Sequence, residues 1–267
     1  MIRPPAIIAI ILAVGAIGIT RETAAEPSVD EIVAKANHAA YYQGSDGRAR
    51  VKLTITDKQA RTRVREMTVL RRNAPGAADG EQQYYVYFHG PADVAKTVFL
   101  VHKKVGGDDD RWLYLPAMDL VKRIAAADKR TSFVGSDFVY EDVSGRGLDE
   151  DTHELIKTTK SYYVLAHVPK DRDKVNFARY VMYIHTGTFL PTKVEYQDAA
   201  GATFRVMTVD KVEKIQGHHT VTRATMEDRS TGSKTTVEYR DIQYDIGLPA
   251  EVFTERYLRR LPVKFIK

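Results

Sequence analysis

The stretch QYYVYFHG, residues 83–90, is apolar or aromatic on both faces of the strand that its composition predicts. KTVFLVHKK (96–104) and ARYVMYIH (178–185) share this pattern. An antiparallel strand that is apolar on both sides must be covered on both sides. One side can take the few predicted helices. The other must meet a second sheet, the inside of its own curl, or a ligand.

Alternation with a period of two residues continues through most of the chain. In VKLTITDK (51–58), for example, Val51, Leu53 and Ile55 share one face. Turn-forming pairs such as Gly106-Gly107 separate the strands. The eleven predicted strands are residues 51–58, 64–72, 83–90, 96–104, 111–116, 162–169, 178–185, 191–198, 204–215, 218–228 and 233–245. The short gaps between most of them favour an antiparallel meander over parallel α/β units.

Two or three helices interrupt this pattern. Ser28 and Glu31 have capping-box spacing at the start of an amphipathic helix that Gly44 ends. Residues 133–147 show no strand period and are predicted to be a loop with a short helix capped at Ser136. Pro249 is predicted to start a C-terminal helix. Eleven strands with so few helices fit a strongly curled sheet with a helical lid, although a filled two-layer sandwich fits the period equally well.

The N-terminus carries the features of a secretory signal peptide. Arg3 precedes an apolar run at residues 6–19, and Thr23 and Ala25 place small residues before a cleavage point. We therefore expect residues 1–25 to be removed on export and residues 26–267 to form a single domain. An uncleaved membrane anchor is the alternative, because the two kinds of segment overlap in length.

The amino-acid composition excludes several kinds of site and several classes of function. The chain contains no cysteine, which excludes disulfides, thiolate metal sites and a lipid-modified N-terminal cysteine. Its formal charge of +5 is mild, and the Lys and Arg residues look spread over the strands. Nucleic-acid binding would require a concentrated basic stripe. A basic exported protein can make transient contact with anionic lipid head groups.

No catalytic constellation is present in the sequence. The stretch 135–137 (GSD) lacks the turn of a hydrolase nucleophile, and His153 lacks the second histidine of a zinc helix. His218 and His219 are adjacent, so on a strand they diverge and cannot converge on one ion unaided. The triple aspartate 108–110 has no calcium-loop spacing and is interpreted as an exposed hairpin loop. We predict neither an enzyme nor a metal or cofactor site.

Three blocks then point to a family. RWLYLPAMDLVKRI (111–124), SFVGSDFVYEDVSGR (132–146) and YDIGLPAEVFTERYL (244–258) resemble, in this order, the outer-membrane lipoprotein-sorting (LolA-like) family. The middle block, with GSDF and YED, is the most specific. The resemblance extends over nearly all of residues 26–267. It implies a curled, incompletely closed antiparallel sheet, LolA/LolB-like, with helices over its opening.

The resemblance also implies a function. Family members carry lipid-modified proteins or other hydrophobic molecules through the periplasm, between the inner and outer membranes. This branch tends to accompany inner-membrane exporters of the resistance-nodulation-division (RND) type. No residue-level cargo or receptor site of the lipoprotein carriers can be matched in this chain. The cargo is therefore either a lipoprotein acyl chain or a free lipid or sterol-like molecule.

A carrier requires a dry cavity with apolar walls, and binding needs no chemistry, since each buried methylene contributes about 0.8 kcal/mol. The predicted cavity-wall residues are Tyr85, Tyr87, Phe99, Trp112 and Tyr114. The predicted lid and loop residues are Phe133, Phe138 and Tyr140. Ordinary core packing explains any one of these aromatic residues equally well.

Two other classes remain as alternatives. One is a β-rich periplasmic scaffold or adaptor of an envelope complex, with a filled core and no ligand cavity. The other is a protein that crosses the outer membrane with its strands. Such strands alternate apolar and polar residues over about 10 positions, whereas these strands carry Lys and Arg on many faces.

Overall fold

One antiparallel sheet of thirteen strands dominates residues 26–76 and 78–266, the part of the chain that the computed structural model describes. The predicted signal peptide, residues 1–25, lies outside these residues. The first six strands are β1 (Asp46–Thr56), β2 (Thr62–Asn73), β3 (Gln82–Gly90), β4 (Val98–Lys103), β5 (Asp110–Leu115) and β6 (Leu120–Ile124). The other seven are β7 (Asp151–Thr158), β8 (Tyr162–Pro169), β9 (Arg179–His185), β10 (Pro191–Gln197), β11 (Thr203–Ile215), β12 (His218–Asp228) and β13 (Ser233–Tyr244).

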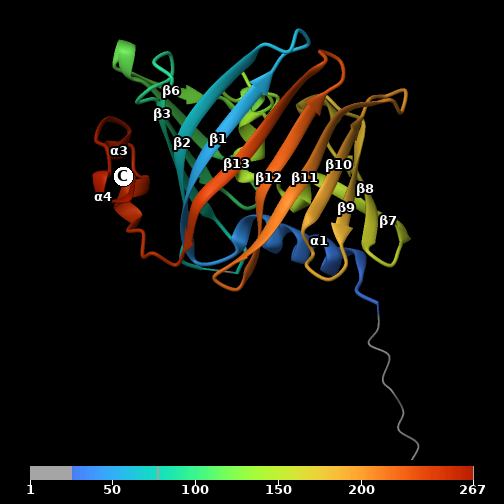
Figure 1. Cartoon of the computed structure of the whole chain (residues 1–267). Coiled ribbons are helices and arrows are strands. Elements are labelled where there is room, and N and C mark those ends of the chain that lie inside the picture. The colour runs from blue at the N-terminus through green and yellow to red at the C-terminus, as the bar shows by residue number, and fades with distance from the viewer. Residues whose placement is uncertain (1–25, 77, 267) are drawn as a thin grey trace, which may run out of the picture.

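The strand order shows how the sheet is built. It runs β6-β5-β4-β3-β2-β1-β13-β12-β11-β10-β9-β8-β7, so two meanders join where β1 pairs with β13. The sheet curls strongly (Figure 1). Its two edges, β6 and β7, are consecutive in sequence and do not pair with each other. The curled, incompletely closed antiparallel sheet is therefore confirmed, and residues 125–150 connect one edge to the other.

The sheet has thirteen strands where the sequence predicted about eleven. The two that were missed, β6 and β7, are the edge strands. An edge strand pairs on one side only and commonly carries charged residues that discourage further pairing. β6 (LVKRI) and β7 (DTHELIKT) have this composition and therefore lack a regular apolar face.

The α-helices lie near the start of the described residues, in the edge-to-edge connection and in the C-terminal segment. The α-helices are α1 (Val29–Asn37), α2 (Tyr140–Ser144), α3 (Arg256–Arg259) and α4 (Val263–Ile266). A π-helical segment, η1 (His38–Tyr42), extends α1, and the 3₁₀ segments are η2 (Pro116–Met118), η3 (Ala126–Asp128), η4 (Leu148–Glu150), η5 (Arg172–Lys174) and η6 (Ala250–Phe253). The predicted capping box of α1 is confirmed, because Ser28 and Glu31 each accept a hydrogen bond from the other's backbone N–H.

The prediction that Ser136 caps a helix is wrong. α2 begins at Tyr140, and Val139 occupies its N-cap position. The hydroxyl of Ser136 instead donates to the carbonyl of Phe133 at 2.7 Å and accepts from the backbone N–H of Phe138 at 3.2 Å. It therefore stabilises the turn before α2. At the C-terminus, η6 follows Pro249 directly, as the sequence predicted.

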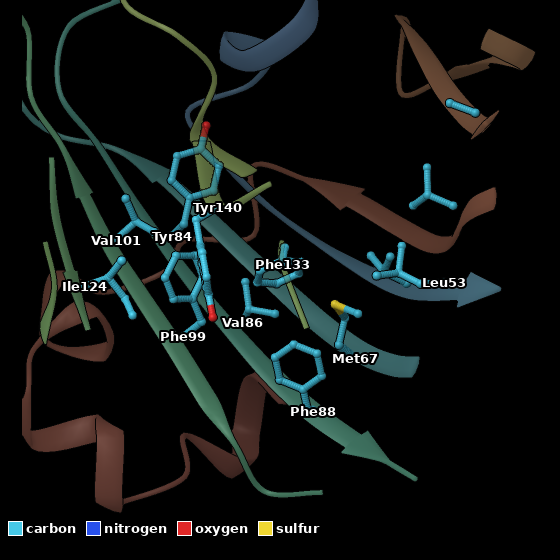
Figure 2. Close-up of a cluster of buried hydrophobic side chains, with 13 residues drawn as sticks. Leu53, Met67, Tyr84, Val86, Phe88, Phe99, Val101, Ile124, Phe133 and Tyr140 are labelled. Atoms are coloured by element: carbon cyan, nitrogen blue, oxygen red, sulfur yellow. The ribbon is translucent and has the colours of Figure 1, made fainter. Parts of the chain in front are cut away.

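The concave face of the sheet is covered by α1 and by the edge-to-edge connection. Ile32 and Val33 of α1 pack against Leu165 and Ile184 of β8 and β9. From the connection, Phe133 packs on Phe99 of β4 with ring centroids 5.5 Å apart. Figure 2 shows Phe133 and Tyr140 over the strands that carry Tyr84, Val86 and Phe99. This is the helical lid that the fold prediction expected.

The convex face is covered locally by the C-terminal segment, residues 248–266. Phe253, Leu258 and Ile266 are buried against Leu70 and Leu100 of β2 and β4. Figure 1 shows α3 and α4 at the left, outside the curl. The strands that are apolar on both faces are thus covered by the lid inside and by the C-terminal segment outside. The described strands form one sheet, so the two-layer sandwich is excluded for this part of the chain.

Candidate ligand cavity

A cavity of about 450 Å³ lies between the concave face of the sheet and the lid. Its volume falls in the range of about 300–1,000 Å³ that small-molecule sites occupy. Its wall comes from β1–β3 and β7–β13, and its cover from α1, η1 and the edge-to-edge connection. Apolar lining residues from the strands include Val51, Leu53, Met67, Val69, Met182, Met207, Val209, Ala224, Met226 and Val237.

The period-two alternation explains why the wall is apolar. On β11, Met207 and Val209 line the cavity, whereas the intervening Thr208 is exposed on the outer surface. Met182 and Met207 add flexible, polarizable side chains that adapt to irregular apolar shapes. Tyr196 and Tyr239 also line the cavity, and they bring aromatic surface into it. The wall can therefore hold an apolar molecule of variable shape.

A buried ionic network lies at the lid side of the cavity. The carboxylate of Glu141 on α2 accepts from Lys129 at 2.9 Å, from Arg130 at 2.9 Å and from Arg146 at 3.3 Å. Burial raises the pKa of Glu141, but the three neighbouring cations, Arg130 first, outweigh it and hold the pKa below its ordinary value. Arg146 also bonds both carboxylate oxygens of Asp151, which ties the connection to β7.

A histidine pair forms part of the same wall. Nδ1 of His153 lies 2.7 Å from Nδ1 of His167, and Nε2 of His153 donates to the carbonyl of Leu148. With its Nε2–H donated to Leu148, an uncharged His153 ring has Nδ1 as its acceptor, and this atom can accept the Nδ1–H of His167. The ring of His167 stacks on Tyr180 with centroids 4.5 Å apart. Burial, followed by the nearby His153, lowers the pKa of His167 to about 3, so this ring stays neutral at ordinary pH.

The structure places four predicted wall residues away from this cavity. Tyr85, Tyr87, Trp112 and Tyr114 pack against the cluster of the convex face, under the C-terminal segment. The hydroxyl of Tyr85, for example, donates to the carbonyl of Tyr257 at 2.9 Å. These four residues therefore pack in a core cluster, which was the alternative to a place in the cavity wall.

The other four predicted residues lie on the concave side. Phe99 and Tyr140 belong to the packed cluster under the lid, with ring centroids 5.0 Å apart, and neither lines the cavity. Phe133 and Phe138 do line it. Thus two of the three lid residues face the cavity, and Phe99 packs against one of them, Phe133, from the strand below.

Sequence reasoning missed most of the apolar residues that line the cavity. It favoured the strands richest in aromatic residues, whereas much of the wall comes from β9–β13. A usable signal was present in FRVMTVDK (204–211), where the inward positions 207 and 209 are apolar and the outward positions 208 and 210 are polar. When one face of a strand is polar and the other apolar, the apolar face is the one that points to the interior of the protein.

The histidine pair 218–219 and the aspartates 108–110, which the sequence offered as possible metal-binding motifs, make other contacts. The His218 ring packs against Tyr244 with centroids 4.7 Å apart. Asp109 forms an ion pair with Arg111 at 2.6 Å, and Asp110 forms one with Lys104 at 2.6 Å. Within residues 26–76 and 78–266, no group of three or more His, Asp or Glu side chains is placed to hold a metal ion. Over the same residues, no helix has the length and apolar character needed to cross a membrane.

A comparison with known proteins shows the family to which the chain belongs. A family model described as "-like: Uncharacterized protein" matches residues 80–260, so the chain belongs to this family. A crystal structure of a DUF1329 family protein from Desulfovibrio piger is 26% identical, with a TM-score of 0.78 over 85% of this chain and 96% of that one. No curated protein matches the sequence.

Two further solved structures bear on the fold. A domain from Vibrio parahaemolyticus, described as an outer membrane lipoprotein-sorting protein, is 27% identical, with a TM-score of 0.78 over 86% of this chain and 97% of that one. A LolA superfamily protein from Nitrosomonas europaea is 20% identical, with a TM-score of 0.66 over 86% and 99% of the two chains. The fold is thus LolA-like, as the sequence resemblance implied. None of these three proteins is described as an enzyme.

Proposed function

We propose that this protein is a periplasmic carrier that binds a hydrophobic molecule in the cavity and moves it between the inner and outer membranes. The cavity of about 450 Å³ with its apolar strand wall is the observation that carries this proposal. Burial of an acyl chain there would contribute about 0.8 kcal/mol per methylene, and no catalytic group is required. The LolA-like fold supports the same class of function.

The cargo is the acyl part of a lipid-modified protein or a free lipid or sterol-like molecule. In this proposal Phe133 and Phe138 contact the cargo from the lid, and Met182 and Met207 contact it from the sheet. The lid must move to admit and release cargo. In this proposal residues 1–25 direct export, and an inner-membrane transporter of the RND type is a partner of the carrier.

A binding experiment tests this proposal. A hydrophobic fluorophore should bind the protein saturably, and lipid extracted from the periplasmic protein and identified by mass spectrometry should displace it. The variant Met207→Glu should weaken binding at least about tenfold, because it places a charge in the apolar wall. Thr208→Glu, one residue further on the outer surface, is the matched control and should bind normally.

Circular dichroism separates a lost site from a lost fold. Met207→Glu should keep a native spectrum, because Met207 is only partly buried and lines a cavity that gives the new side chain room, unlike a close-packed core. Phe99→Asp should instead unfold the protein, since Phe99 is fully buried in the packed cluster. Absence of saturable binding by the unsubstituted protein would contradict the carrier function and favour the scaffold.

A further inference from the structure

The basic residues of the chain are concentrated more than the sequence suggested. The segments 116–124 and 256–266 contain six Lys and Arg residues and a single acidic residue, Asp119. Their formal charge of +5 equals that of the whole chain, so the remaining residues are balanced. The two segments are far apart in sequence, which explains why no basic stripe was recognised.

The fold brings these segments together. Asp119, at the tip of the β5–β6 hairpin, accepts from Nε of Arg259 at 2.8 Å, and its carbonyl accepts from Nη2 of Arg259 at 3.1 Å. The Arg259 guanidinium also lies over the Tyr114 ring, 5.6 Å from its centroid. In Figure 1, β6 lies at the upper left, above α3 and α4. We name this surface the basic tip and define it by Met118, Leu120, Lys122, Arg123, Arg259 and Arg260.

Apolar side chains project from the basic tip. Met118 is 65% exposed and Leu120 is 45% exposed. Lys122 and Arg123 could be explained as edge-strand charges that prevent pairing with another sheet. That explanation does not extend to two exposed apolar residues at the end of the hairpin. Leu120 and Lys122 lie on the face of β6 that pairs with Leu113, and Arg123 lies on the opposite face beside Trp112. The end of the hairpin thus carries exposed apolar side chains with cations close to it on both faces, and an anionic bilayer surface binds this combination.

We propose that the basic tip docks this protein on anionic lipid bilayers. Met118 and Leu120 enter the acyl boundary, and the cations on the two faces of the hairpin contact lipid phosphates. Asp110 pairs with Arg123 and Asp119 pairs with Arg259, whereas Lys122 and Arg260 have no carboxylate partner in the described part of the chain. Those two side chains are therefore free for lipid. The proposal does not depend on the carrier function, because the basic tip lies outside the cavity wall.

Vesicle flotation tests the docking surface. The protein should bind phosphatidylcholine vesicles that contain phosphatidylglycerol, bind vesicles of phosphatidylcholine alone much more weakly, and lose binding as salt rises. Lys122→Ser with Arg260→Ser should weaken binding by about fivefold for each cation removed. Lys211→Ser with Arg223→Ser removes the same charge from the exposed face of β11 and β12, and should have a much smaller effect.

The apolar contribution is tested separately. Met118→Ser with Leu120→Ser leaves the charge unchanged and should weaken binding about tenfold, because both side chains lose their burial in lipid. Equal effects of the two charge variants, or no effect of this apolar variant, would overturn the proposal. Absence of vesicle binding by the unsubstituted protein would also overturn it and leave an acidic protein as the partner. Met207→Glu should dock normally, which separates a docking failure from a cavity failure.

Discussion

At the residue scale, Glu141 is the most constrained charge of the lid. Its side chain is 3% exposed, and cations from three positions of the chain, 129, 130 and 146, surround it. Removing one partner of a buried ion pair is strongly destabilising, because the remaining charges stay buried without compensation. The sequence shows the Glu141-Asp142 pair but not the three cations that determine its state.

We expect Glu141→Gln to lower the free energy of unfolding at neutral pH by about 3–5 kcal/mol, measured by urea denaturation. The pKa of Glu141 in the folded protein is below its ordinary value of 4.5. Its stabilisation is therefore complete above pH 4.5 and is lost as pH falls through the lower folded value. The difference between the variant and the unsubstituted protein should shrink in that acidic range. Glu154→Gln, on the exposed side of β7, is the control, and an equal loss there would contradict this account.

At the element scale, the lid depends on a close contact between η1 and the end of α2. A Cβ atom added to Gly145 would lie 2.6 Å from the Tyr41 ring, which is closer than real Cβ atoms approach. Gly145 also has φ 76° and ψ 159°, a conformation that is essentially restricted to glycine. Only glycine therefore lets these two lid segments pack together over the cavity.

We expect Gly145→Ala to lower the free energy of unfolding by about 1–3 kcal/mol from backbone strain and by a similar amount from the clash with Tyr41. Hydrogen exchange should also become faster in residues 130–148. Adding Tyr41→Ala removes the ring and should make the Gly145→Ala change less costly than it is alone. Gly106→Ala, in an open loop with φ 71°, is the control for positive-φ strain. Equal losses at Gly145 and Gly106 would show that the contact is unimportant.

At the scale of the whole molecule, the sheet separates two surfaces with different proposed tasks. The concave face and the lid enclose the cavity, and the convex face carries the C-terminal segment that completes the basic tip. Both surfaces lie within residues 26–266, and the proposed membrane-to-membrane carriage requires that this part of the chain be released after export. A retained apolar run at residues 6–19 would tether it to one membrane.

N-terminal sequencing of the exported protein checks this requirement. Cleavage after Ala25 should give a chain that starts at or within a few residues of Glu26. An intact N-terminus recovered from washed membranes would show that residues 1–25 form an anchor. In that case the protein could still dock lipid through the basic tip, but it could not shuttle freely.

The sequence by itself determined the local structure of this protein. The period-two runs predicted eleven of the thirteen strands, and the Ser28–Glu31 spacing predicted the capping of α1. These features depend on neighbours within a few residues, so composition and spacing are sufficient to find them. The need to cover both faces of residues 83–90 also followed from their pattern alone.

Only the tertiary structure decided which face became the cavity wall. Alternation separates two faces of a strand, but when both are apolar it does not say which one lies inside. Tyr85 and Trp112, which the sequence offered equally as cavity wall or as core, pack in the cluster of the convex face. The pairing of β1 with β13 and the meeting of Asp119 with Arg259 join residues far apart in the chain. Such contacts depend on how the whole sheet curls, and no local spacing encodes that curl.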